Sequence, residues 1–468
     1  MSEYVDLEFS AAEMQKMGEL AVKAVVEHIA SLPDAPRSNL DEAEALVRQL
    51  REDPPEHGEP FEKLLHLLMN KIIPVSVNTA HPSYMAYVPG GGVYPSAVAD
   101  FIASATNRFL GVWFTAPAAS RLEANVLEWF ARWMDYPDSA RGILTTGGSL
   151  ANFSAIVTAR KALLGDNIAK GTLYMSSQTH HSVIKAALLA GIPQQNIRLL
   201  PVDSRFKAIP EKFESAIRED LKRGLRPFMI VANAGTTNTG SVDPLADLAE
   251  ISRRFELWYH IDGAYGGFFR MTPEKHSLLR DIALSDSVVL DPHKGLFVPY
   301  GTGSLIVKVG EKLQQAHMLP AEYLQDHQVP ENEINPADHS PELSRSYRGL
   351  RVWLPIKLYG MKAIRSNLQE KLHLTRWLYA QLQNMPGFEC FNEPELTVVT
   401  FRYRAHSADV NETNRRLLQA INQSKKLFMS STRLNGDFVL RLCVLSFRTH
   451  RKEVEEALEV IGHFARRL

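Results

Sequence analysis

Three segments of this chain contain side chains that could do chemistry, and each of them follows an apolar run. The first segment is TTGGSLAN (145–152), the second is WYHIDGAYG (258–266) and the third is DPHKGL (291–296). Open parallel sheets bind their ligands beyond the carboxyl ends of the strands. We therefore expect the polar residues of these three segments to meet around one ligand.

The first segment has the composition of a phosphate-binding turn. Gly147 and Gly148 leave backbone N–H groups accessible, Ser149 offers a hydroxyl, and the N-terminus of the helix that follows attracts an anion. Turns of small residues between a strand and a helix are common, so this segment alone is a weak indication.

The other two segments supply an acid and an amine. Asp262 ends an apolar strand, where a carboxylate is costly to bury unless it meets a cation such as a protonated pyridine nitrogen. Lys294 ends the next strand, beside His293. An isolated Asp-Gly pair is more typical of an exposed turn, and a lone lysine is more often a solvated charge. A phosphate turn, an acid and a lysine in this order together favour a pyridine aldehyde phosphate.

Seven β-rich runs alternate with helical segments and would position these side chains. The runs are GILTTGG, TLYMSS, IRLLPVD, PFMIVANAG, LWYHIDGAYG, SVVLDPHK and GSLIVKV. Strands that alternate with helices form a mostly parallel sheet with helices on its faces, so the fold class is α/β.

Different patterns lie on the two sides of this region. Amphipathic helices are expected at 14–32, 40–51 and 61–71. We expect them to form an arm whose apolar faces pack against another surface. After residue 320, a polar stretch with several prolines has no apolar periodicity and predicts a long mobile loop that acts as a lid.

The remaining C-terminal sequence predicts a smaller α+β domain. Its expected elements are a helix at 349–364, strands at 396–404 and 437–446, and helices at 412–423 and 454–467. We divide the chain into an N-terminal helical arm (1–85), a large cofactor-binding domain (86–345) with a mobile loop at 320–342, and a small C-terminal domain (346–468).

Composition narrows the class of partner. The 52 Lys and Arg residues nearly balance the 53 Asp and Glu residues, so no global field holds the chain on nucleic acid or a membrane. The two cysteines, Cys390 and Cys443, form no metal-binding spacing. The N-terminus lacks the pattern of a secretory signal, and no apolar run reaches the roughly 20 residues that span a bilayer. We therefore expect a cytoplasmic protein that acts on a small molecule and holds no metal.

The sequence resembles the group II pyridoxal-phosphate-dependent amino acid decarboxylases, and within them the aromatic-L-amino-acid decarboxylases. The resemblance is carried by HPSYMAYVP, TTGGSLAN, THHSV, AGTTNTGSVDP, HIDGAYGG, DPHK, AEYL and SYRGLRVWLPIKLYG. It implies pyridoxal 5'-phosphate as cofactor and decarboxylation of an L-amino acid to the amine and CO2. It also implies fold type I of the PLP-dependent transferases, the aspartate aminotransferase type, in a homodimer whose arm wraps the partner subunit.

The same resemblance assigns roles to single residues. Lys294 matches the lysine that binds the cofactor aldehyde as an imine, and Asp262 matches the acid that keeps the ring nitrogen protonated. His180 matches the histidine stacked on the ring, with His181 as the competing choice. Tyr323 matches the tyrosine that protonates the product. The remaining implied contacts are Gly147, Gly148, Ser149, Ala264 and His293 with the cofactor, Thr237 rather than Thr236 with cofactor and substrate, and Tyr87 and Pro89, together with His180 and Tyr323, with the substrate.

Other reactions on this fold need the same lysine, acid and phosphate turn, so aminotransfer and carbon–carbon or carbon–sulfur cleavage stay open. THHSV, DPHK and AEYL favour decarboxylation. Aminotransferases typically grip the substrate carboxylate with an arginine of the small domain, and plant aldehyde synthases replace the loop tyrosine by Phe. A non-catalytic cofactor-binding protein would be expected to lack Lys294. The arginines available for such a grip are Arg402, Arg404, Arg433 and Arg441.

The substrate is an aromatic L-amino acid by first expectation. Thr79, Val88 and Gly111 stand where the aromatic enzymes commonly have aromatic residues, and Gly295 stands where they have a tryptophan. Asp291 replaces their usual asparagine, and an acid beside a phosphate repels it unless it is protonated or turned away.

Overall fold

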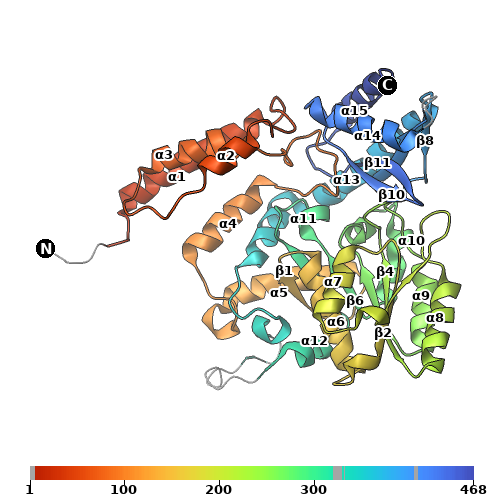
Figure 1. Ribbon diagram of the computed structural model, residues 1–468. Coiled ribbons are helices and arrows are strands. Elements are labelled where there is room, and N and C mark those ends of the chain that lie inside the picture. Colours follow the sequence, from red (N-terminus) through yellow and green to blue (C-terminus); the bar gives the residue numbers. More distant parts are fainter. Residues whose placement is uncertain (1–5, 320–328, 331–332, 405–408) are drawn as a thin grey trace.

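In the described part of the chain, a seven-stranded sheet forms the centre of the large domain (Figure 1). The structure is a computed structural model, and it describes residues 6–319, 329–330, 333–404 and 409–468. All seven expected runs are strands. They are β1 (Arg141–Thr145), β2 (Gly171–Ser176), β3 (Ile197–Leu200), β4 (Arg226–Asn233), β5 (Trp258–Asp262), β6 (Ser287–Leu290) and β7 (Gly303–Val307).

The sheet is mostly parallel, as the alternating pattern predicts. Its strand order is β1-β7-β6-β5-β4-β2-β3, and β7 runs antiparallel to both of its neighbours, β1 and β6. The neighbouring strands from β6 to β3 pair in parallel. The carboxyl ends of all strands except β7 therefore meet at one edge of the sheet.

Helices cover both faces of this sheet, because side chains of a buried strand alternate between two apolar layers. Ile230 faces the layer that contains α5 (Pro117–Trp133), α8 (Pro210–Lys222) and α9 (Leu245–Arg254). Val231, the next residue of β4, faces α6 (Gly148–Leu163), α7 (His181–Leu189) and α12 (Gly310–His317).

A second, antiparallel sheet forms the small domain, with strand order β10-β11-β9-β8. The sequence predicts β9 (Val398–Tyr403) and β11 (Asp437–Cys443). The three-residue strand β8 (Phe388–Cys390) and the polar strand β10 (Ser430–Leu434) escaped prediction. Helices α14 (Val410–Gln423) and α15 (Arg451–Ala465) pack on it. The long helix α13 (Arg348–Asn384) leads into this domain and is interrupted at Gly360, where φ is 72°.

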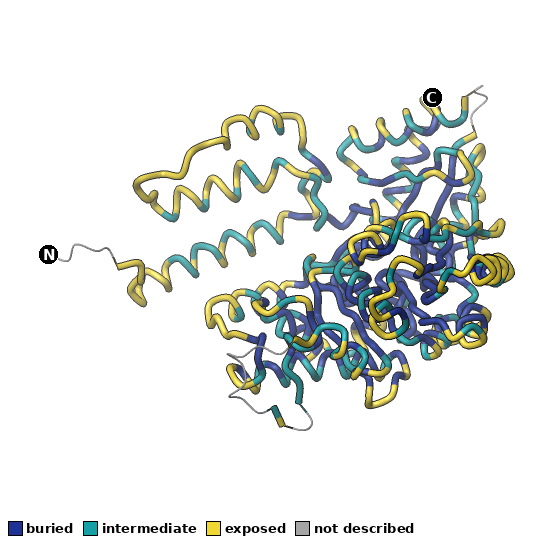
Figure 2. Tube along the Cα trace, turned by 60° about the horizontal axis from the view of Figure 1, so that its bottom comes forward, coloured by how far each residue is buried: buried dark blue, intermediate teal, exposed yellow. Residues whose placement is uncertain are grey.

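The N-terminal helices stand away from both domains (Figures 1 and 2). They are α1 (Ala11–Ser31), α2 (Ala43–Gln49) and α3 (Phe61–Leu67), and α3 continues into the short helix η1 (Leu68–Ile72). No residue of α1, α2 or α3 is buried. The remaining described helices are α4 (Tyr94–Thr106), η2 (Trp113–Thr115), η3 (Ile168–Lys170), η4 (Gln194–Asn196), η5 (Gly267–Met271), α10 (His276–Leu279), η6 (Arg280–Leu284), α11 (Pro292–Gly295) and η8 (Pro336–His339).

The expected loop at 320–342 falls only partly within the described residues. Residues 320–328, which include Tyr323, and 331–332 lie outside them. The described end of the stretch is packed, because η8 buries Pro336 and His339 and the Ala337 N–H donates to the Gly111 carbonyl at 3.0 Å. Separately, a search of the described residues finds no helix that is long and apolar enough to cross a membrane.

Candidate active site

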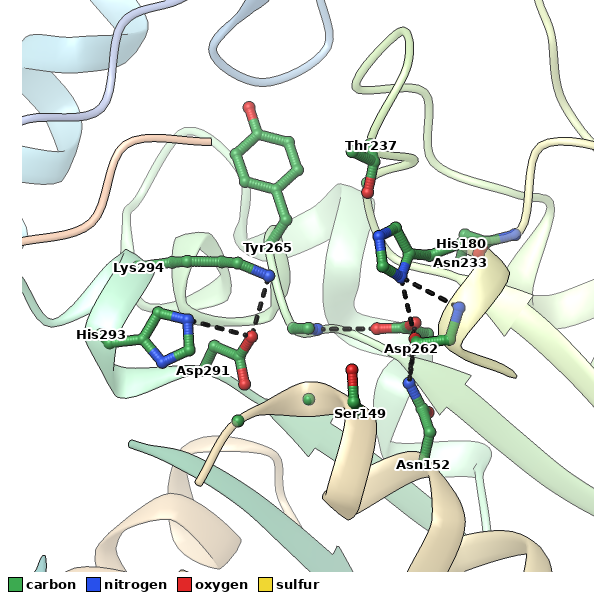
Figure 3. A pocket seen from close by; sticks show the side chains of 15 residues that line it. Ser149, Asn152, His180, Asn233, Thr237, Asp262, Tyr265, Asp291, His293 and Lys294 are labelled. Carbon is green, nitrogen blue, oxygen red and sulfur yellow. Dashed lines mark hydrogen bonds and ion pairs between the residues drawn. The ribbon is translucent and has the colours of Figure 1, made fainter. Parts of the chain in front are cut away.

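A cavity of about 200 Å³ lies at the carboxyl edge of the large sheet (Figure 3). The three segments that the sequence singles out all contribute to it. This is expected, because the carboxyl ends of β1, β5 and β6 lie at the same edge of the sheet. Its lining residues are Gly147, Gly148, Ser149, Asn152, His180, Ser182, Asn233, Gly235, Thr237, Asp262, Ala264, Tyr265, Asp291, His293 and Lys294.

The N-terminus of α6 opens into this cavity. The first N–H groups of a helix have no intrahelical acceptor. In α6 the N-cap residue is Gly147, and no side chain caps the helix. A Cβ atom on Gly148 would lie 3.1 Å from Asp291 Oδ2 and 3.3 Å from Ala264 Cβ, tighter than most real contacts. Glycine at this position therefore lets the backbone approach a ligand, and the positive end of the helix dipole favours an anion there.

Asp262 ends β5 and is largely buried beneath the cavity. Its Oδ1 accepts a hydrogen bond from the Ala264 N–H at 3.1 Å, and its Oδ2 accepts one from Asn152 Nδ2 at 3.2 Å. Both bonds come from neutral groups, so the carboxylate still needs a positive partner in the cavity.

Lys294 follows β6 on the short helix α11, and its Nζ lies 2.8 Å from Asp291 Oδ2. Burial by itself would lower the pKa of Lys294, but the charge and hydrogen bond of Asp291 outweigh burial and raise this pKa. His293 Nε2 lies 3.5 Å from the same oxygen, and burial lowers the pKa of His293. The amine is thus held as an ammonium beside the phosphate turn.

His180, and not His181, lines the cavity, and His181 is exposed. His180 precedes α7 as its N-cap residue, and its Nδ1 accepts a hydrogen bond from the Ser182 N–H at 3.3 Å. Burial lowers the pKa of His180, and the negative charge of Asp262 only partly offsets this. A neutral imidazole with its proton on Nε2 therefore stands on one wall of the cavity, which Ala264 also lines.

Thr237 lines the cavity and Thr236 does not. The hydroxyl of Thr236 is buried and engaged with the Thr239 hydroxyl at 2.8 Å. Arg441 holds the Thr237 segment in place by donating to the carbonyls of Thr237 at 2.6 Å and Asn238 at 3.2 Å. The preference for Thr237 over Thr236 agrees with this placement.

Two of the expected substrate residues, Tyr87 and Pro89, lie outside the cavity lining in the described structure. Tyr87 is 63% exposed and has a φ of 51°, a left-handed conformation that is strained for a bulky side chain. Ser430 Oγ accepts from its N–H at 3.0 Å, and Arg441 donates to its carbonyl. Tyr323 lies outside the described residues.

Sequence reasoning missed several lining residues, among them Asn152, Ser182 and Asn233, and it left Asp291 aside. Asn152 is the last residue of the quoted TTGGSLAN segment, and Asn233 ends β4 just as Asp262 ends β5. Their position at strand and helix ends was the available signal. Asn233 Nδ2 donates to the buried Asp243 at 2.7 Å and to Thr179 at 3.0 Å, which fixes the turn between β4 and Thr237.

The residues of the cavity fit pyridoxal phosphate. The uncapped N-terminus of α6 suits its phosphate, the carboxylate of Asp262 suits a protonated ring nitrogen, and the amine of Lys294 suits its aldehyde. Buried Oδ1 of Asp291 has no hydrogen-bond partner among the described residues. The carboxylate of Asp291 lies beside Gly148 of the phosphate turn and would repel a phosphate bound there.

Comparisons with known proteins agree with this chemistry. A family model described as "Pyridoxal-dependent decarboxylase conserved domain" matches residues 44–404. The aromatic-L-amino-acid decarboxylase of Bacillus atrophaeus is 34% identical over 465 residues, which are 98% of this chain and 97% of the relative. The phenylacetaldehyde synthase of Arabidopsis thaliana is 31% identical over 469 residues, covering 96% of this chain and 95% of the relative.

A solved structure shows the same fold. The crystal structure of Oryza sativa TDC with PLP and tryptamine superimposes with a TM-score of 0.94 at 27% identity, covering 99% of each chain. The fold is thus that of the PLP-dependent decarboxylases, with a mostly parallel central sheet and a smaller antiparallel one. With its family model, its cavity and its fold in agreement, this chain belongs to the pyridoxal-dependent decarboxylases.

Proposed function

We propose that this enzyme converts an aromatic L-amino acid to its amine and CO2, with Lys294 as the residue that binds pyridoxal phosphate. One observation carries the assignment of roles. Lys294, Asp262 and the uncapped N-terminus of α6 open into a single cavity at the carboxyl edge of the sheet. Gly147, Gly148, Ser149 and His293 are the phosphate contacts that this arrangement supports.

Bound pyridoxal phosphate supplies a protonated ring that accepts the electron pair left behind when CO2 departs. Asp262 holds the proton on the ring nitrogen from below the cavity, since a buried carboxylate favours the charged pyridinium. His180 and Ala264, which both line the cavity, would hold the ring, and Thr237 would orient the substrate. The neutral state of His180, which follows from its lowered pKa, suits packing against the ring.

Tyr323 delivers the proton that completes the amine, and this role rests on the AEYL segment alone. A phenol donates a proton readily to a basic carbon in a water-poor site. The relative named phenylacetaldehyde synthase shows that aldehyde formation also occurs within the family. The tyrosine in this chain favours amine formation over the aldehyde.

The arrangement of arginines favours decarboxylation over aminotransfer. None of the four candidate arginines lines the cavity in the described part of the chain. Arg402 pairs with Glu389 at 2.8 Å and Asp437 at 2.7 Å, and Arg404 pairs with Glu389 at 3.0 Å. Arg441 is occupied by backbone carbonyls, and Arg433 is exposed. The described lining therefore contains no arginine that could bind the substrate carboxylate as in an aminotransferase.

An aromatic substrate is supported by the substrates of the related proteins and by Tyr87. The comparisons include an aromatic-L-amino-acid decarboxylase and a structure with tryptamine bound. The exposed, strained Tyr87 is a residue that a partner subunit and a substrate could cover together. Gly295 does not widen the site, because a Cβ there would lie 2.7 Å from Phe268 Cβ, which already fills the space.

We expect the enzyme to work as a homodimer in the cytoplasm. The arm has no buried residue in its three α-helices (Figure 2). It exposes many apolar side chains, which a second copy would cover. Both cysteines are unpaired, which fits a reducing compartment. The exposed apolar residues of the arm are Leu7, Phe9, Met14, Val22, Val26, Leu40, Val47, Leu50, Leu64, Leu67, Leu68 and Ile73.

Reductive trapping tests the assignment of Lys294. Borohydride treatment of the cofactor-loaded enzyme should attach the reduced cofactor to the peptide that contains Lys294. The Lys294→Ala variant should lose the visible-range absorbance, the attachment and all turnover, because no other amine lines the cavity in the described structure. Lys185→Ala, which removes an exposed lysine of α7, is the matched control and should retain all three. Attachment of the cofactor to another lysine would overturn the assignment.

A further inference from the structure

A chain of buried polar side chains leads away from Asp262 under the floor of the cavity. Trp258, His260 and Asp262 alternate along β5 and therefore point to the same face of the sheet, toward α6. Ser287 stands opposite His260 on the neighbouring strand β6. All four residues are buried, and so is Asn152 of α6, which lies between His260 and Asp262.

The contacts along this chain are all of hydrogen-bond length. Trp258 Nε1 lies 2.8 Å from Ser287 Oγ, which lies 2.8 Å from His260 Nδ1. His260 Nε2 lies 2.9 Å from Asn152 Oδ1. Asn152 Nδ2 completes the chain at 3.2 Å from Asp262 Oδ2, the bond drawn in Figure 3. We call Trp258, Ser287, His260 and Asn152 the β5 relay.

The donor and the acceptor of every bond follow from the two residues at the ends of the chain, Asp262 and Trp258. A carboxylate only accepts, so Asn152 turns its NH2 group to Asp262 and its Oδ1 to His260. His260 must then donate from Nε2, and a neutral imidazole that donates there accepts at Nδ1. The Ser287 hydroxyl consequently donates to Nδ1, and its oxygen accepts from the indole N–H of Trp258, which can only donate.

The opposite direction leaves a defect. With Asp262 protonated, Asn152 could turn round, and His260 would donate from Nδ1 to Ser287. Ser287 Oγ would then accept from two donors, and its own hydrogen would have no acceptor among the contacts it makes in the described residues. An unsatisfied buried hydroxyl of this kind destabilises the arrangement. Only the direction in which Asn152 donates to Asp262 satisfies every group.

Burial supports the neutral state that this direction requires of His260. Loss of solvation lowers the pKa of His260 to about 4, although the charge of Asp262 and a hydrogen bond to the backbone of Ser287 act in the opposite sense. The imidazole is therefore uncharged at neutral pH, with one nitrogen that donates and one that accepts.

We infer that the β5 relay keeps the Asn152 amide in the orientation that donates to Asp262, and thereby holds Asp262 ionised and aimed at the cofactor ring. The inference rests on the proposed role of Asp262 and adds positioning residues to it. Trp258, Ser287 and His260 touch neither substrate nor cofactor and act through Asn152.

The tautomer of His260 gives a test that does not depend on activity. Full-length protein labelled with 15N-histidine, with and without pyridoxal phosphate, should show among its ring signals that of a neutral His260 with its proton on Nε2 at neutral pH. The signal should disappear in His260→Gln. Ser287→Ala, which removes one hydroxyl, should shift the Nδ1 resonance of His260 because Nδ1 loses its donor. A proton on Nδ1, or an imidazolium at neutral pH, would overturn the relay.

The protonation state of the cofactor ring nitrogen tests whether the relay supports Asp262. With pyridoxal phosphate labelled by 15N in the ring, His260→Phe should move the nitrogen resonance toward the unprotonated value. The same variant should lower kcat about tenfold while KM changes little, since supporting partners typically contribute 10–100-fold. His260→Gln, whose amide can donate to Asn152 and accept from Ser287, should restore both readouts.

Two comparisons separate the possible failures. His339→Phe removes another buried imidazole that is not part of the relay and should leave the nitrogen resonance unchanged. Equal impairment of His260→Phe and His260→Gln, or an unchanged resonance in His260→Phe, would contradict the relay. An unprotonated ring nitrogen in the unaltered enzyme would instead contradict the proposed role of Asp262, while the His260 tautomer stays an independent measurement.

Discussion

Lys294 Nζ lies 2.8 Å from Asp291 Oδ2, so the amine proposed to bind the cofactor is already paired with an acid. The second oxygen of Asp291 is buried and has no hydrogen-bond partner among the described residues. The same carboxylate borders Gly148 in the phosphate turn. Cofactor binding must therefore separate the Lys294–Asp291 pair and bring a phosphate close to an acid.

Asp291→Asn should strengthen cofactor binding about tenfold, because the phosphate no longer meets a carboxylate. The change also removes the group that raises the pKa of Lys294 and leaves burial, which lowers it. A larger fraction of Lys294 is then a neutral nucleophile at neutral pH. The pH dependence of covalent attachment, followed by visible absorbance, should shift to lower pH. Asp247→Asn, an exposed acid of α9, is the control, and weaker cofactor binding in Asp291→Asn would contradict this account.

Asp262→Ala should lose far more rate than cofactor affinity. The carboxylate acts most strongly when the ring accepts electrons, so kcat should fall by about 10²–10³-fold at saturating cofactor. Steady-state kinetics combined with a cofactor titration separates the two effects. A near-normal kcat in this variant would show that Asp262 is only an anchor.

Tyr323→Phe should uncouple CO2 release from amine formation. The ring remains but the donated proton is lost, so the amine yield should fall about tenfold or more while CO2 release continues. Oxygen then oxidises the unprotonated product carbon, and water completes the conversion to aldehyde, ammonia and hydrogen peroxide. Amine, CO2 and peroxide are measured together. Amine formation at the parental rate without peroxide would make His180 the next candidate.

Limited proteolysis tests the expected lid. The polar, proline-interrupted sequence of 320–342 predicts early cleavage, and the buried side chains of η8 narrow the expected site to 320–332. A substrate analogue should protect this site. Mass spectrometry of the first fragments locates the cut, and a first cut in another segment would count against a lid here.

Much of the large domain is readable from the sequence because its strands are buried on both faces. Runs such as PFMIVANAG are apolar throughout and end in polar or glycine-rich turns, so their strand character and the position of Asp262 follow directly. The small domain is harder to read. The strand β10 reads SSTRL, which has no continuous apolar run, and the signal that was available for it is the Asn435-Gly436 turn that joins it to β11 as a hairpin.

The residues of the cavity also divide into those that the sequence reveals and those that only the structure reveals. Lys294 and Asp262 carry chemistry that the sequence displays, whereas the choice between His180 and His181 needs the geometry of the α7 N-terminus. The β5 relay is implicit in the alternation of Trp258, His260 and Asp262, but its partner Asn152 comes from another element. A network that joins a strand, its neighbour and a helix leaves no local pattern in the chain.

Product analysis with a carboxyl-labelled substrate tests the central claim most directly. The cofactor-loaded enzyme is incubated with L-phenylalanine, L-tyrosine or L-tryptophan that carries 13C in the carboxyl group, and mass spectrometry follows both products. For at least one of them, the label should leave as CO2 in equal amount to the unlabelled amine, and Lys294→Ala should give neither. A keto acid that retains the label would contradict decarboxylation and identify the reaction as aminotransfer.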